Sequence, residues 1–253
     1  HVRHRGDGGR TVTNDRDSLM SPEDNRRMFD GLARKYDRMN RIVSLGQDRW
    51  WRRKAVARLD PQPGQRYLDV GCGTGDMILE ILRQCPDAEV VGIDPAENML
   101  AVADAKLRRA DATGAVTLSA GDGMDLAFDD ASFDVVYCNA VVEHVGSRCR
   151  QEQLVAELLR VGRRVFLATP DRDCPLESHT LIPFAHWLPA AICRRIYRLA
   201  GRGYFASEEN LNLVDSGQLR RLFPPELRNE VEIRRQYLAG MSAVITASIG
   251  TSR

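Results

Sequence analysis

The fold is decided by the stretch Leu68-Asp69-Val70-Gly71-Cys72-Gly73-Thr74-Gly75-Asp76. An apolar strand ends there in a turn with glycine at alternate positions, and a helical pattern begins directly afterwards. Glycines at such a turn let the backbone approach a ligand closely. The spacing differs from the Gly-x-Gly-x-x-Gly of nicotinamide dinucleotide sites, and the acid Asp69 disfavours a phosphate group. The turn therefore predicts a ligand that carries an ammonium or sulfonium group.

Outward from this turn, short apolar runs alternate with amphipathic helical patterns. Strands are predicted at 67–70, 90–93, 116–119, 133–138 and 165–168, and helices at 77–82, 99–107 and 154–159. Such alternation predicts parallel strands joined by right-handed crossovers, which is a doubly wound α/β sheet. After Pro170 the alternation ends, and we expect a short helix at 219–222 and closing strands at 231–237 and 241–247.

The 253 residues are expected to form one domain with appendages. We divide the chain into a disordered tail (1–20), an N-terminal helical arm (21–60), a ligand-binding core (61–170), a lid-like helical and aromatic insertion (171–215), and a closing helix with C-terminal strands of the same sheet (216–253). Phe184 and Trp187 in the insertion are predicted to lie in the core, as large apolar side chains usually do.

Composition limits the partners. Lys and Arg number 36 against 35 Asp and Glu, so no global charge favours nucleic acid, and no nucleic-acid partner is expected. Basic residues dominate between Arg26 and Arg58, which we interpret as a solvated helical face, with peripheral membrane contact as the alternative. Six cysteines without Cys-x-x-Cys spacing and the lack of a long apolar run predict a cytoplasmic protein with reduced thiols.

Polar residues follow the later strands at the same edge of the predicted sheet. Asp94 ends the second strand, where an acid binds ribose hydroxyls in doubly wound folds. Asp122 follows the third strand, where it would accept a hydrogen bond from an adenine amine while Met124 packs on the ring. The fourth strand ends at Asn139. Together the four strand ends predict an adenosyl ligand.

The run 68–75, with Gly92-Ile93-Asp94 and Met99-Leu100, resembles the class I S-adenosylmethionine-dependent methyltransferases over 66–170. The resemblance implies a Rossmann-like, doubly wound, mostly parallel seven-stranded sheet. It also implies S-adenosylmethionine as cofactor and S-adenosylhomocysteine as product, with contacts at Thr74, Asp94, Asp122, Gly123 and Asn139. With the strand-end reasoning, the predicted cofactor-binding set is Asp69, Gly71, Cys72, Gly73, Thr74, Asp94, Pro95, Met99, Asp122, Gly123, Met124, Asn139 and Ala140.

The run from Met28 to Asn40, continuing through 44–46 to Trp51-Arg52, resembles the ubiquinone/menaquinone-biosynthesis C-methyltransferases. This resemblance implies a small apolar acceptor, a polyprenyl quinol methylated at a ring carbon. Three stretches depart from that family: 139–144, 159–163 and 169–187. They concern the substrate, so two alternatives stay open. One is O- or N-methylation of a natural product, sugar or other small molecule, and the other is cofactor binding without methyl transfer.

Ring-carbon methylation needs a general base, because a ring hydroxyl must lose its proton. Glu143 and His144 lie just past the fourth strand, and His144 ranks first because imidazole titrates near neutral pH. A structural role is an equal alternative for both, with Glu143 as a helix cap or in a pair with an arginine, and His144 as a polar residue at a turn. Tyr36, in the quinone-like run, is the third candidate. His179 has no metal-ligand company near it in the sequence, so no bound metal is predicted.

Overall fold

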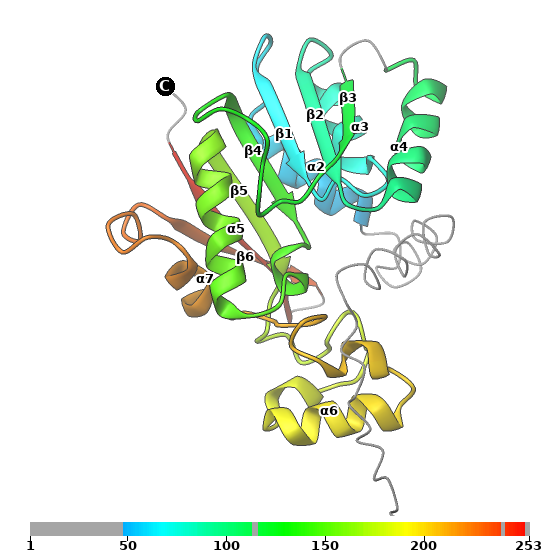
Figure 1. The fold of residues 1–253 in the computed structure, drawn as a ribbon, viewed down its shortest axis with the longest axis vertical. Coiled ribbons are helices and arrows are strands. Elements are labelled where there is room, and N and C mark those ends of the chain that lie inside the picture. Colours follow the sequence, from blue (N-terminus) through cyan, green and yellow to red (C-terminus); the bar gives the residue numbers. More distant parts are fainter. Residues whose placement is uncertain (1–47, 113–115, 239–240, 251–253) are drawn as a thin grey trace, which may run out of the picture.

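The computed structural model describes residues 48–112, 116–238 and 241–250. Its strands are β1 Arg66–Val70, β2 Glu89–Asp94, β3 Val116–Ala120, β4 Phe133–Asn139, β5 Gly162–Pro170, β6 Glu232–Leu238 and β7 Met241–Ile249. They form one seven-stranded sheet in the order β3-β2-β1-β4-β5-β7-β6 (Figure 1). Neighbours from β3 to β5 are parallel, and β7 is antiparallel to both β5 and β6. The doubly wound, mostly parallel sheet predicted from the sequence is confirmed.

The strand order reverses between β1 and β4, which places a binding crevice at the carboxyl ends of these strands. Successive side chains of β1 point to opposite faces, and both faces are buried, since Tyr67 and Leu68 are each almost fully covered. This explains why the parallel strands read as continuous apolar runs rather than as an alternating pattern.

Helices cover both faces of the sheet (Figure 1). The cluster on one face includes side chains of α2 Asp48–Leu59, α3 Asp76–Gln84 and α4 Glu97–Arg109. The cluster on the other face includes side chains of α5 Arg148–Val161 and α7 Ser216–Leu222. Because α3 begins directly after the glycine turn, its packing fixes where that turn lies.

The N-terminal arm is described only from α2 onward, and residues 1–47, with the predicted tail and the first part of the arm, lie outside the described residues. The part of the arm that the structure describes is helical, as predicted, and α2 ends at Leu59. Arg52 of α2 binds Asp76 at the start of α3 over 2.5 Å. The Arg164 guanidinium of β5 donates to the Leu59 carbonyl over 3.0 Å. The first contact attaches α2 to the core beside the glycine turn, and the second attaches the end of α2 to β5 at the level of the start of β1.

Between β5 and α7 the chain forms a small lobe beyond one end of the sheet, which contains α6 Ala190–Leu199 (Figure 1). Short 3-10 helices, η3 Ala185–Trp187 and η4 Gly203–Ala206, flank α6 and pack against it. The predicted core positions of Phe184 and Trp187 are wrong, because their side chains are 55% and 48% exposed. The buried cluster of this lobe is small and leaves both rings outside it. No helix in the described part of the chain has the length and apolar character needed to cross a membrane.

Candidate active site

The turn after β1 is built by glycine. Gly71, Gly73 and Gly75 all have positive φ angles, of 72°, 52° and 77°. A Cβ at Gly71 would lie 2.3 Å from Cγ2 of Val141, so glycine is required where the turn meets the chain after β4. A Cβ at Gly73 would meet nothing within 4 Å. Gly73 therefore faces open space in which a ligand can approach the backbone.

Asp94 holds this turn against the end of β2. Its Oδ2 accepts a hydrogen bond from the Gly73 amide over 2.8 Å, and its Oδ1 accepts from the Ala96 amide over 2.9 Å. The side chain is buried at this position. Each carboxylate oxygen can accept a second hydrogen bond. Asp94 can therefore bind the hydroxyls of a sugar while it keeps the turn in place.

Asp69 is a buried carboxylate that forms no ion pair with any residue the structure describes. It is only 2% exposed, and its Oδ2 has no hydrogen-bond partner among the described residues. Burial, together with the negative charge of Asp94, raises the pKa of Asp69 to about 7. A buried charge without a partner is unfavourable unless a counter-charge arrives. The residues present thus fit a cofactor that carries positive charge, as the sequence predicted.

Thr74 belongs to a polar network that the sequence did not predict. Its hydroxyl oxygen accepts from Lys106 Nζ over 2.9 Å, and the same ammonium binds Asp76 over 2.6 Å. Asp76 in turn binds Arg52 of α2. The network fixes the start of α3 from two sides. Lys106 and Arg52 lie far from Thr74 and Asp76 in the sequence, so no local sequence pattern predicts the network.

Four further predicted cofactor residues lie after the ends of β1, β2 and β4, and their side chains differ in exposure. Cys72 is buried, and burial raises the pKa of its thiol. Pro95 is exposed directly after β2, whereas Met99 is buried beside Ala96. Ala140 has a positive φ of 55° and donates its amide to the Ala168 carbonyl over 2.8 Å. Their contacts with a cofactor stay predictions.

The polar residues after β3 and β4 lie at the same edge of the sheet. Asp122 is exposed and its Oδ1 accepts from the Met124 amide over 3.0 Å. Asn139 is exposed at the end of β4. The Met124 side chain lies in the core cluster with α5, and a Cβ at Gly123 would come within 2.8 Å of Val70. The expected packing of Met124 on an adenine ring stays a prediction.

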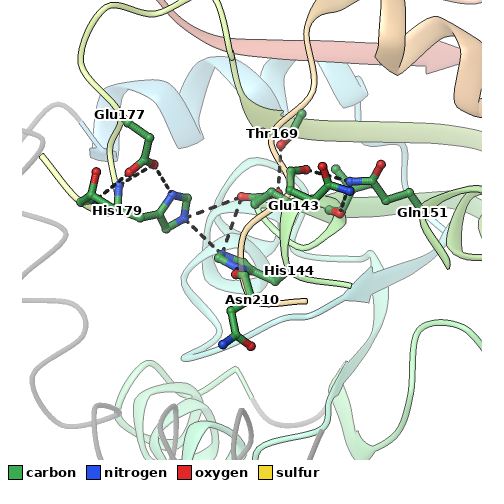
Figure 2. A network of polar contacts seen from close by, with 10 residues as sticks. Glu143, His144, Gln151, Thr169, Glu177, His179 and Asn210 are labelled. Atoms are coloured by element: carbon green, nitrogen blue, oxygen red, sulfur yellow. Dashed lines mark hydrogen bonds and ion pairs between the residues drawn. The ribbon is translucent and has the colours of Figure 1, made fainter. Parts of the chain in front are cut away.

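Glu143 and His144, on the short helix η2 Val142–His144, belong to a polar cluster next to the turn (Figure 2). Glu143 is fully buried; its Oε2 accepts from Thr169 Oγ1 over 2.9 Å, while its Oε1 has no hydrogen-bond partner. Within the described residues Glu143 caps no helix and pairs with no arginine. His144 Nδ1 lies 2.7 Å from the Asn210 carbonyl oxygen. A carbonyl only accepts, so Nδ1 donates and Nε2 of His144 is the acceptor nitrogen.

His179 completes the cluster from the lobe after β5. Its Nε2 lies 3.1 Å from Nε2 of His144, and its Nδ1 lies 2.6 Å from Oε1 of Glu177 (Figure 2). The expectation that His179 has no ligand-type neighbours is wrong, because the fold brings His144 and Glu143 to it. Sequence reasoning missed this cluster. The one sequence feature that pointed to the cluster was Thr169, at the end of β5 and so beside the end of β4. Nothing in the sequence connects His179 or Asn210 to η2.

The pKa values of the two imidazoles are shifted in opposite directions. Burial, together with the neighbouring charge of His179, lowers the pKa of His144 to about 3. Burial also lowers the pKa of His179, but the hydrogen bond to Glu177 and the negative charge of Glu177 outweigh this effect and raise it. Burial raises the pKa of Glu143, partly offset by the charge of His179. His179 therefore holds a proton more readily than His144, and in the contact between the two Nε2 atoms His179 is the donor.

Residues 19–186 match the ubiE/COQ5 methyltransferase family. The chain is 33% identical to a demethylmenaquinone methyltransferase from Roseiflexus castenholzii over 79% of this chain and 78% of that protein. It is 30% identical to one from Staphylococcus aureus over 90% of this chain and 94% of that protein. A 37% identical match from Symbiobacterium thermophilum spans 57% of this chain and 59% of that protein, so part of this relative has no counterpart in the match.

Solved structures share the fold at lower identity. The structure of magnesium protoporphyrin IX methyltransferase from Synechocystis PCC 6803 with bound SAH matches with a TM-score of 0.59 and 18% identity, over 90% of this chain and 100% of that one. A SAM-dependent methyltransferase from Aquifex aeolicus matches with a TM-score of 0.53 and 14% identity, over 87% and 96% of the two chains.

The charge state of Asp69 predicts a pH effect on stability without ligand. The unfolded chain releases this proton near pH 3.8, whereas the folded chain keeps it to about pH 7. Stability therefore falls as pH rises through that range. The Asp69→Asn variant should be about 1–4 kcal/mol more stable than the wild type at pH 8 and nearly equal at pH 4.

Urea unfolding of the ligand-free protein at both pH values measures this difference. Asp129→Asn, at an exposed aspartate, is the matched control and should leave stability unchanged at either pH. An Asp69→Asn variant less stable than the wild type at pH 8 would contradict this interpretation of Asp69.

Proposed function

Since the chain belongs to the ubiE/COQ5 methyltransferase family and is an S-adenosylmethionine-dependent methyltransferase, we propose that it methylates a ring carbon of a polyprenyl quinol. The observation that carries the proposal is the family match over residues 19–186, which spans both the quinone-like N-terminal run and the glycine turn. Relatives named demethylmenaquinone methyltransferase, at 30% and 33% identity, support the acceptor class.

The residues around the glycine turn would hold the cofactor. S-adenosylmethionine, when bound, supplies an electrophilic methyl group on a sulfonium. In our proposal Asp69 compensates the positive charge of the ligand, and Asp94 binds the ribose hydroxyls. Gly73 leaves space for the ligand against the backbone. These residues contribute mainly by orientation and by exclusion of water, because charge disperses along a displacement from a sulfonium.

The cluster of Glu143, His144 and His179 would act on the acceptor. It lies beside the cofactor turn, since Val141, directly before η2, is the neighbour that Gly71 accommodates. A phenolate makes its ring carbon nucleophilic, so the acceptor's hydroxyl must release a proton, and Oε1 of Glu143 would accept it. The same carboxyl group would return a proton to that oxygen as the methylated ring carbon releases its own. The imidazole of His179, beside Glu177, would stabilise the phenolate. We therefore assign Glu143 and His144 to deprotonating and holding the acceptor's hydroxyl. Tyr36 lies outside the described residues, and its role stays a prediction.

The acceptor's lipid character fits an exposed surface on the lobe after β5. This lobe surface comprises Phe184, Trp187, Leu188, Ile192, Arg195, Arg198 and Leu199, all exposed. Aromatic and aliphatic side chains mixed with arginines are typical of segments that lie on anionic lipid surfaces. We propose that the enzyme works in the cytoplasm, in contact with a membrane through this lobe surface.

A second candidate function is supported by the sequence stretches from which the residues of the cluster come. Glu143, His144 and His179 come from the stretches 139–144 and 169–187, which depart from the quinone-like pattern. A buried cluster of two imidazoles and a carboxylate also suits the hydroxyl of a water-soluble phenol or sugar. O- or N-methylation of such a molecule is therefore the alternative. Cofactor binding without transfer is the alternative of another class.

Labelled S-adenosylmethionine distinguishes these functions. With demethylmenaquinol in detergent micelles, we expect label in the lipid fraction and one S-adenosylhomocysteine per methyl group transferred. The Asp94→Ala variant should lose at least about 100-fold in turnover, since its turn and sugar contact both depend on that carboxylate. Label only in water-soluble acceptors of a phenol and sugar panel would reject the quinol, and binding without any S-adenosylhomocysteine would reject transfer.

Membrane contact through the lobe surface has its own test. Vesicles of phosphatidylglycerol should co-sediment with the wild type, and added salt should weaken the binding because the arginines contribute. Ile192→Ser combined with Leu199→Ser should reduce the bound fraction about 10-fold, since two apolar side chains lose their burial in lipid. Tyr237→Ser, at an exposed residue of β6 that does not belong to the lobe surface, is the control. Equal binding by the double variant would contradict this contact.

A further inference from the structure

Three potential metal ligands converge beside the cofactor turn. Among the residues that the structure describes, Glu143, His144 and His179 are the group whose ligand atoms all lie within 4.8 Å of one another. The two Nε2 atoms are 3.1 Å apart, and Glu143 Oε1 lies 4.0 Å from each of them. Two ligands of one tetrahedral zinc ion, at about 2.0–2.1 Å from it, are separated by about 3.3 Å. The imidazoles already have this separation, and the carboxylate needs a shift of less than about 1 Å.

Each of the three groups is oriented by a further residue, as metal ligands usually are. His179 Nδ1 bonds the Glu177 carboxylate, and His144 Nδ1 donates to the Asn210 carbonyl. Both bonds use the Nδ1 atoms and leave the Nε2 atoms toward the centre of the group. Thr169 donates to Oε2 of Glu143 and leaves its Oε1 facing the imidazoles (Figure 2). Second partners thus orient both Nε2 atoms and Oε1 of Glu143 toward one point, and Nε2 of His179 would give up its proton as a metal ion binds.

The point of convergence lies beside a buried carboxylate and is accessible. Glu143 is fully buried, and its Oε1 lacks a hydrogen-bond partner. The side chains of His144 and His179 are 12% and 19% exposed, so an ion can reach them from solvent. From this geometry we propose that Glu143, His144 and His179 bind one divalent first-row transition-metal ion, with Glu177, Thr169 and Asn210 as supporting residues.

The ligand set selects the class of ion. Two imidazoles and one carboxylate suit Zn²⁺, Co²⁺ and Fe²⁺, whereas Mg²⁺ and Ca²⁺ prefer oxygen ligands. Three protein ligands leave coordination positions for solvent or for an oxygen of a substrate. The ion would replace the proton between the Nε2 atoms and keep a positive charge there. The binding site itself does not depend on which acceptor the enzyme uses.

Metal titration of the full chain tests the site without any activity measurement. Protein stripped with a chelator should take up one Zn²⁺ per chain in calorimetry, and Co²⁺ should give visible d–d bands of nitrogen and oxygen coordination. Glu143→Gln, His144→Gln and His179→Gln should each lower the affinity at least about 100-fold, and Glu177→Gln about 10–100-fold. Mg²⁺ in excess should not compete.

Histidines outside the cluster are the matched controls. His186→Gln changes a buried imidazole that bonds the Arg172 carbonyl, and His1→Ala with His4→Ala removes the other two histidines of the chain. Both should bind Zn²⁺ like the wild type. No uptake by the wild type, a thiolate-to-cobalt charge-transfer band, or loss of uptake in either control would overturn the proposal. The proposal would also be overturned if Glu143→Gln, His144→Gln and His179→Gln show normal thermal unfolding and bind Zn²⁺ as tightly as His186→Gln does.

Discussion

The buried carboxylates of Asp69 and Asp94, at the ends of neighbouring parallel strands, are the constraint on which the rest of the structure depends. Asp94 is satisfied by the amides of Gly73 and Ala96, and it thereby holds the glycine turn at the switch point of the sheet. Among the described residues no group donates a hydrogen bond to Oδ2 of Asp69, so the burial of its charge is unfavourable. A cationic ligand beside Asp69 removes that penalty.

The cluster of Glu143, His144 and His179 lies on the other side of Val141 from the glycine turn along the chain, since η2 follows Val141 directly. Glu177 and Glu143 hold charge on His179, whose Nε2 meets that of His144. The glycine at position 71 allows the chain after β4 to approach the turn, and so brings η2 near it. One side of the site therefore suits a sulfonium, and the other suits an oxygen that becomes negative. Methyl transfer to a phenol needs both.

Most of the fold could be predicted from the sequence, because its signals are local. The run from Leu68 to Asp76 contains the end of β1, the glycine turn and the first residue of α3, and the later strands keep the same apolar pattern. Asp94 could be placed because parallel strands end at one edge. The cluster of His144 and His179 could not, because it depends on the path of the lobe after β5. Phe184 and Trp187 were misplaced for the same reason: their lobe has its own small core and leaves them outside it.

Calorimetric titration with S-adenosylhomocysteine tests the central claim most directly, because this product keeps the ribose and adenine but carries no methyl group to transfer. The account predicts that the wild type binds it and that Asp94→Ala, with an unchanged circular dichroism spectrum, binds it at least about 100-fold more weakly, the equivalent of about 2.7 kcal/mol. Equal affinity in the two proteins, or no heat of binding in the wild type, would contradict the account.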